Sequence, residues 1–184
     1  MYLTAKIAAD SWLTSQYNLS PGGLTACISI FGFAKALDSL ELLLEKVIEK
    51  NVLLNTKQIN TLLSAFNRCE LETISLAIFN KMKTDSFINS INIETFPIIE
   101  SKENRFISLI EKMSFNLNRD QYTYGIILKT LEKLNQWQVA YDIFKNIPSK
   151  RHGPEFLIER NLVMYNTILS SLSKAGKWEN ALKM

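Results

Sequence analysis

Four segments of the sequence carry polar and cationic side chains at one common spacing. In each, four positions follow at i, i+3, i+7 and i+11, which an α-helix with about 100° per residue places within roughly 80° of arc. Three segments have Asn or Thr at the second position, and three end in a cation. In chain order the sets are Gly22, Thr25, Ser29 and Phe33; Lys57, Asn60, Ser64 and Arg68; Tyr122, Gly125, Lys129 and Lys133; and Val163, Asn166, Ser170 and Lys174.

These side chains suit the recognition of single-stranded RNA. Asn or Thr can form hydrogen bonds with a base edge, and single-residue readout of bases occurs on helical repeats. A Lys or Arg one or two turns further along can contact a phosphate, which adds affinity without sequence preference. The alternative is a solvated helix face, because such faces commonly carry small polar residues and lysines. The spacing alone leaves both interpretations open.

Other kinds of site find little support. Cys27 and Cys69 are far apart and His152 is the single histidine, so their spacing assembles no zinc site. Two cysteines within helical patterns favour packing in a reducing compartment. No carboxylates have metal-site spacing, and neither a nucleophile–base pair nor a glycine-rich phosphate loop occurs. We therefore predict no catalytic residues, no metal, no cofactor and no small-molecule substrate.

Paired amphipathic helices are the elements that must position the polar face. Apolar residues recur at i, i+3, i+4 and i+7 on the opposite side, which indicates one buried helical face. The first stripes are Leu24, Cys27, Ile28 and Phe31; Ile59, Leu62, Leu63 and Phe66; Tyr124, Ile127, Leu128 and Leu131; and Tyr165, Ile168, Leu169 and Leu172. Second stripes are Leu40, Leu43, Leu44 and Val47; Ser75, Ile78, Phe79 and Met82; Phe106, Leu109, Ile110 and Met113; and Ala140, Ile143, Phe144 and Ile147, with Ala181 opening another.

The turns between paired helices repeat as well. Gly176 and Asn135 lie 41 residues apart, and both residue types accept the left-handed conformation that ends a helix. Trp178 and Trp137 follow at the same offset. We expect these tryptophans to pack the second helix of a pair against the first.

The periodicity predicts an all-α solenoid of about five stacked helix-turn-helix units, one of them degenerate. Segment 87–101 fits a first helix poorly, since Glu94 and Pro97 stand where apolar residues are expected, and Pro148 and Pro154 bracket an inserted loop. The predicted boundaries are 1–20 for the end of a preceding unit or a cap, then 21–55, 56–86, 87–120 (degenerate), 121–161 (with the insertion) and 162–184 (truncated).

Net charge and the chain ends give weaker indications of function than the repeats do. The net charge of +3 permits an anionic partner. No apolar run of about 18 residues predicts a membrane span. The first arginine is Arg68 and no apolar signal core precedes it, so no targeting segment is visible. Because the last apolar stripe stops at Met184 within its first turn, we expect the native protein to continue.

Three pairs of strings resemble the pentatricopeptide repeat family. The resemblance covers roughly residues 21–184, and the Trp, Leu-Gly and Tyr signature of the similar tetratricopeptide repeat is absent. The strings are VMYNTIL (163–169) with KAGKWENAL (174–182), INTLL (59–63) with AIFNKM (77–82), and YTY (122–124) with AYDIF (140–144).

The resemblance implies how a base is read: by a polar residue of the first helix together with the last residue of the unit. It pairs Thr25 with Asn55 as purine-preferring and Asn60 with Ser86 as pyrimidine-preferring. Gly125 with Asn161 departs from the pattern and should read nothing, and the partner of Asn166 would lie beyond Met184. With the cationic positions, the predicted RNA-binding residues are Thr25, Asn55, Lys57, Asn60, Arg68, Ser86, Lys129, Lys133, Asn161, Val163, Asn166 and Lys174.

The function implied is an organellar, mitochondrial RNA-binding protein that contacts single-stranded RNA and has no enzymatic activity. The alternative is a scaffold subunit of a mitochondrial ribosome or another large ribonucleoprotein. Its helices would then pack on other ribonucleoprotein subunits and on structured ribosomal RNA. The direction in which the cations point distinguishes the two functions, because a protein that reads single-stranded RNA needs its cations along one continuous surface.

Overall fold

The computed structural model describes residues 2–14, 20–82, 101–147 and 158–184, which form ten α-helices and no β-strand. The chain divides into two compact units, residues 1–82 with 95–117 and residues 83–94 with 118–184. In the first unit the helices are α1 (Tyr2–Thr14), α2 (Pro21–Phe33), α3 (Leu37–Glu49), α4 (Thr56–Arg68), α5 (Glu72–Lys81) and α6 (Ser101–Lys112). In the second they are α7 (Gln121–Lys133), α8 (Trp137–Asn146), α9 (Leu162–Lys174) and α10 (Trp178–Leu182).

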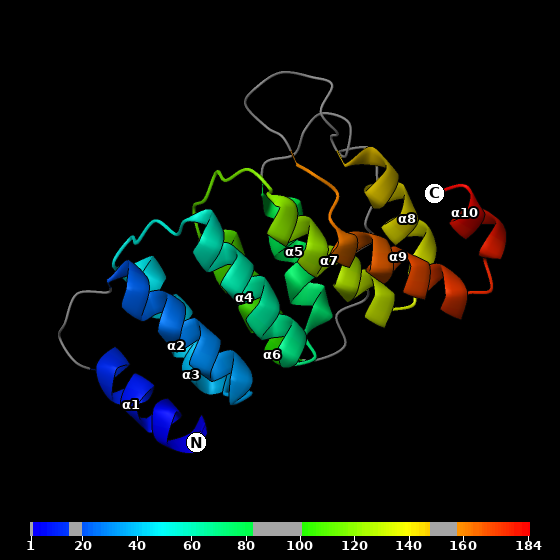
Figure 1. Ribbon diagram of the computed structural model, residues 1–184. Helices are drawn as coiled ribbons and strands as arrows, with labels where there is room; N and C mark the ends of the chain where they lie inside the picture. Colours follow the sequence, from blue (N-terminus) through cyan, green and yellow to red (C-terminus); the bar gives the residue numbers. More distant parts are fainter. Residues whose placement is uncertain (1, 15–19, 83–100, 148–157) are drawn as a thin grey trace. The chain divides into compact units, whose positions relative to one another are not determined.

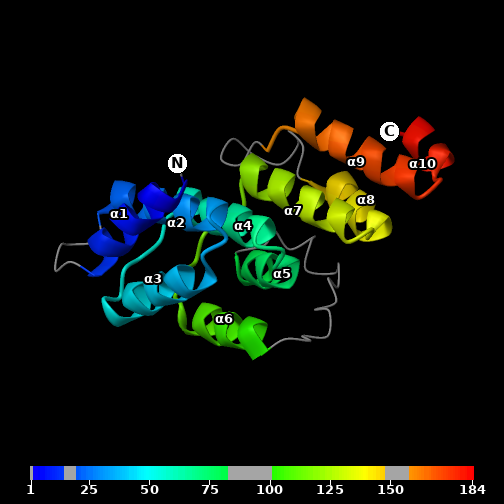
Figure 2. The ribbon, with the colours of Figure 1, turned by 90° about the horizontal axis from the view of Figure 1, so that it is seen from below.

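Within each unit, helices pack on their neighbours as in a helical repeat. In the first unit α2 lies between α1 and α4 and also packs on α3, while α4 packs on α5 and α6 closes against both α3 and α5 (Figures 1 and 2). In the second unit α7 packs on α8 and α9, and α9 packs on α8 and α10. This architecture confirms the predicted all-α repeat fold.

The predicted apolar stripes form the core of both units. The stripes of α2, α4 and α7 are buried throughout, as are those of α3 and α8. The stripe of α9 is only partly as predicted, because Ile168 and Leu172 are buried whereas Tyr165 is half-buried and Leu169 is exposed. The reason is that α10, with five residues and none of them buried, covers little of α9. Met164 of α9 is buried in addition.

The four first helices begin with the same side-chain cap. Each N-cap residue stands four positions before the first stripe residue, and its side-chain oxygen accepts a hydrogen bond from a backbone N–H of the first helical turn. The caps are Ser20 to Gly23, Asn55 to Gln58, Asp120 to Thr123, and Asn161 to Met164.

The same helices end in the same turn. The residue two positions after each has a positive φ, and the N–H that follows it donates to a carbonyl five residues back, as in a Schellman motif. The predicted left-handed turns at Asn135 and Gly176 are confirmed, with φ of 56° and 67°. Lys35 and Glu70 occupy the equivalent positions, with φ of 50° and 63°. The donated bonds run from Ala36 to Phe31, Leu71 to Phe66, Gln136 to Leu131, and Lys177 to Leu172.

The two tryptophans expected to pack second helices against first helices differ in burial. Trp137 is half-buried, with the Lys177 ammonium 5.2 Å from its ring centre. The expected packing is wrong for Trp178, which is 65% exposed because α10 is so short. The degenerate segment 87–101 and the loop between Pro148 and Pro154 lie almost entirely outside the described residues.

Candidate nucleic-acid interface

The predicted pair Thr25 and Asn55 is linked through Gln58 and the backbone carbonyl of Pro21 in α2. The Thr25 hydroxyl and the Gln58 side-chain amide both donate to the Pro21 carbonyl, at 2.9 and 3.2 Å. Gln58 in turn accepts from the Asn55 backbone N–H at 2.8 Å. The Asn55 oxygen caps α4, so its amide nitrogen is the group left to donate to a ligand. The structure therefore brings these two residues to the N-terminal ends of α2 and α4.

The other predicted base-contacting residues differ in exposure. Asn166 is exposed, whereas Asn60 is buried to 8% exposure and takes part in other interactions within the fold. The expectation of an open polar face is thus wrong at Asn60, because α4 is packed against both α2 and α5. A Cβ placed on Gly125 would meet no atom within 4 Å. Ser86 lies outside the described residues.

The first position of the polar face (Gly22, Lys57, Tyr122 or Val163) is exposed in all four first helices. Lys57 is exposed on α4. Asn161, two residues before Val163, is the N-cap of α9 and is partly exposed. Val163 and Tyr122 hold the same register position in α9 and α7, and both are largely exposed, at 65% and 66%. An exposed aliphatic or aromatic surface beside polar groups can contact the flat face of a base.

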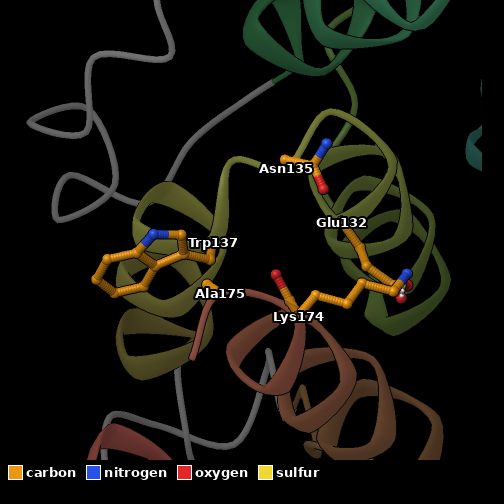
Figure 3. A pocket seen from close by; sticks show the side chains of 6 residues that line it. Glu132, Asn135, Trp137, Lys174 and Ala175 are labelled. Carbon is orange, nitrogen blue, oxygen red and sulfur yellow. Dashed lines mark hydrogen bonds and ion pairs between the residues drawn. The ribbon is translucent and has the colours of Figure 1, made fainter. Parts of the chain in front are cut away.

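Two cations of the second unit, Lys129 and Lys174, bind one residue that the polar spacing does not single out. Glu132 of α7 has a side chain only 2% exposed. Its Oε1 accepts from Ser170 Oγ at 2.6 Å and from Lys174 Nζ at 2.7 Å, both on α9, and its Oε2 accepts from Lys129 Nζ at 2.6 Å. Figure 3 shows Lys174 reaching from α9 toward Glu132. Lys129, Ser170 and Lys174 are therefore held together by one buried carboxylate between two first helices.

The environment of Glu132 keeps it ionised. Burial alone raises the pKa of a carboxyl group, but the hydrogen bonds from Lys129, Lys174 and Ser170 outweigh burial and hold the pKa of Glu132 at about 2. The side chains of Lys129 and Lys174 remain 61% and 58% exposed. Each ammonium has three N–H donors, so the bond to Glu132 fixes its position and leaves donors for a phosphate oxygen.

An open pocket of about 310 Å³ adjoins this carboxylate at the ends of α7 and α9 (Figure 3). It combines the partly buried Trp137 ring with polar side chains from the turn and from α9. Its lining residues are Glu132, Asn135, Trp137, Ser171, Lys174 and Ala175.

The remaining cations are Lys133 and Arg68. Lys133, at the end of α7, is exposed and has further interactions in the chain. Arg68, at the end of α4, is half-buried, and its guanidinium carbon lies 4.0 Å from the ring centre of Phe33 on α2. Phe33 and Arg68 hold the same register position in neighbouring first helices. The structure thus pairs this cation with an aromatic ring.

Neither a metal-holding cluster nor a membrane-spanning helix occurs in the part of the chain that the structure describes. No group of three or more His, Cys, Asp and Glu there could hold a metal ion, and no helix there is long and apolar enough to cross a membrane. Cys27 and Cys69 are free thiols. Burial, with the nearby Asp10 charge, raises the pKa of Cys27 to about 11, and burial also raises the pKa of Cys69. Raised thiol pKa values agree with packing as their role.

Fold and site together define a helical-repeat protein with a partly cationic face on its first helices. The family model described as PPR repeat matches residues 163–184, which span most of α9 and all of α10. This match confirms the predicted resemblance to the pentatricopeptide repeat family in that segment. A comparison with curated proteins found no match. A PPR repeat is a mark of RNA-binding helical-repeat proteins, which are generally not enzymes.

Proposed function

We propose that this protein binds single-stranded RNA through the first helices of its repeats, without catalysis, inside an organelle and specifically the mitochondrion. One observation carries the proposal: the PPR repeat match falls on α9, and Val163, Asn166 and Lys174 of that helix are exposed on one face. These three positions supply an apolar contact, a base-edge hydrogen bond and a cation. They are the components that single-strand recognition combines.

The geometry of the second unit supports a defined role for each group. Asn166 offers both donors and an acceptor to a base edge. Lys174 and Lys129 are held at fixed places by Glu132, so less side-chain entropy is lost when they contact phosphate. Lys133 lies one helical turn beyond Lys129 on α7. We propose that these lysines give affinity and that Asn166 gives base preference.

The first unit offers a second reading position. Thr25 and the Asn55 amide nitrogen lie at neighbouring helix ends, and Lys57 is exposed within the first turn of α4. We propose that Thr25 with Asn55 prefers a purine. Asn60, being buried, contributes to this unit through packing and reaches a base only if α4 shifts.

A scaffold in a mitochondrial ribosome or another large ribonucleoprotein is the second candidate. The observation that favours it is Glu132, whose charge offsets one of the two lysines it holds. Burial of Asn60 also reduces the number of base-reading positions. A scaffold would bind structured RNA and protein subunits in preference to free single strands.

The test is a comparison of RNA forms. Fluorescence anisotropy with the purified chain should show tighter binding to labelled single-stranded RNAs than to an RNA duplex with the same total number of phosphates. No measurable binding at low salt would remove the RNA-binding proposal. A preference for the duplex would instead favour the scaffold. Imaging of the tagged full-length protein against a mitochondrial marker tests the location, and a nuclear or cytosolic signal would contradict it.

A further inference from the structure

We propose that Phe33 and Arg68 together form a stacking platform for one RNA base at the C-terminal ends of α2 and α4. The inference rests on the proposed RNA-binding function and specifies one contact within it. It gives Arg68 a different role from the phosphate contact expected from the sequence. The guanidinium, supported from below by Phe33, would present a flat cationic surface to a base.

The geometry fits a layered arrangement. The Arg68 guanidinium carbon lies over the Phe33 ring at 4.0 Å from its centre, well within the range of about 6 Å for cation–π contacts. Phe33 is 46% exposed although it is large and apolar. The ring therefore supports the guanidinium at the surface and is not simply a core side chain.

The hydrogen-bonding groups of Arg68 are available. Arg68 makes no hydrogen bond or ion pair with any residue that the structure describes, and it is only half-buried. Glu70, two residues after Arg68, forms an ion pair with Lys35, with Lys35 Nζ 2.6 Å from Glu70 Oε1. Arg68 therefore has guanidinium N–H donors that no described residue occupies, and its guanidinium carbon lies over the Phe33 ring.

A base of an RNA strand is the occupant that this chemistry favours. Arginine planes and aromatic rings both stack bases, and the positive charge attracts the anionic backbone of the same strand. Lys57 lies on the same side of α4, since eleven residues at about 100° each return to within roughly 20°. A strand passing along α4 would thus meet a cation at one end and a stacking surface at the other.

The experiment uses the full chain with labelled single-stranded RNA and compares Arg68→Lys, Arg68→Ala and Phe33→Leu. Arg68→Lys keeps the charge and loses the plane, so affinity should fall at least about fivefold while the salt slope stays unchanged. Phe33→Leu keeps an apolar residue and should give a similar loss. Both magnitudes correspond to the loss of one stacked base. Leu42→Ala, an exposed apolar change on the second helix α3, is the matched control and should leave affinity unchanged.

Each outcome has one meaning. If Arg68→Lys binds as well as the unaltered chain while Arg68→Ala lowers the salt slope, Arg68 is a phosphate contact and the platform is wrong. If Phe33→Leu has no effect, the ring is not part of the site. If the unaltered chain binds no RNA, the proposed function itself fails and the platform with it. Circular dichroism of each variant establishes that the helices are intact.

Discussion

The interfaces α2–α4 and α7–α9 differ in the residue at one equivalent position, which is a glycine in the first and a buried glutamate in the second. Gly32 of α2 and Glu132 of α7 both stand eight residues after the first apolar residue of their stripes, Leu24 and Tyr124. At Gly32 a Cβ would lie 2.6 Å from Ala65 Cβ and 2.7 Å from Ala65 Cα. At Glu132 the same position carries a buried carboxylate bound by side chains of α9.

The difference shows what one register position of a repeat can do. A glycine at this position lets two first helices approach until their backbones are in contact. A carboxylate at this position joins the helices through polar bonds and fixes cations on the surface. The first interface gains dispersion contacts and the second gains an ordered charge pattern. A variant at either position therefore tests which contribution matters there.

The largest expected effect is the loss of a core side chain, which the two units should share. Phe66→Ala in α4 and Leu128→Ala in α7 remove fully buried groups and should lower the free energy of unfolding by about 2–5 kcal/mol. Urea unfolding followed by circular dichroism measures the change. A loss well under about 1 kcal/mol in either variant would show that its stripe is not core.

Glycine to alanine changes should have opposite signs in the two regions. Gly32→Ala forces the α2 and α4 backbones apart and should cost about 1–3 kcal/mol. Gly125→Ala in α7 meets no atom within 4 Å and should stabilise by roughly 0.5–1 kcal/mol, because alanine is the better helix former. Urea midpoints of the two variants give the comparison. Equal signs would contradict the close approach inferred at Gly32.

Neutralising Glu132 should remove an acid-dependent part of the stability. The folded-state pKa of about 2 is below the ordinary value of 4.5, so the stabilisation is present above about pH 4.5 and is lost as the pH falls toward 2. The shift corresponds to roughly 3 kcal/mol at neutral pH. Glu132→Gln should therefore unfold more easily at pH 7 and show a shallower acid transition. Identical acid transitions for both proteins would contradict the ion pairs of the buried Glu132 carboxylate.

The smallest expected effect concerns the left-handed turns. Asn135→Ala places a residue with a Cβ and no local hydrogen bond at φ of 56° and should cost about 1 kcal/mol. Glu70→Gly, at the equivalent turn with φ of 63°, should instead gain up to about 1 kcal/mol, since its exposed pair with Lys35 contributes little. Thermal unfolding of both variants measures the difference. A stabilised Asn135→Ala would be the contrary result.

The sequence predicted the helix pairs and most of the core because apolar spacing reports one buried face directly. It also predicted the turns at Asn135 and Gly176, whose residue types favour positive φ. It did not predict the equivalent turns at Lys35 and Glu70, since these residues carry no such preference and the Schellman bonds hold them there.

The candidate site was predicted less well, because side-chain partners depend on which helices meet. The Lys129, Ser170 and Lys174 positions were found by spacing, but Glu132 was not, although it stands directly before Lys133 and next to the buried Leu131. A charged residue adjoining the apolar stripe was the available signal. The spacing places Asn60 on the open face of an isolated helix, whereas in the fold α4 packs between α2 and α5 and Asn60 is buried.

The most direct test of the account is the salt dependence of RNA binding. Lys133→Ala with Lys174→Ala should weaken binding to all single-stranded RNAs alike and lower the slope of log affinity against log salt by about 0.7 for each lost phosphate contact. Asn166→Ala should change base preference and leave that slope nearly unchanged. If the double lysine variant binds RNA with unaltered affinity and slope, the first helices do not form the RNA-binding face.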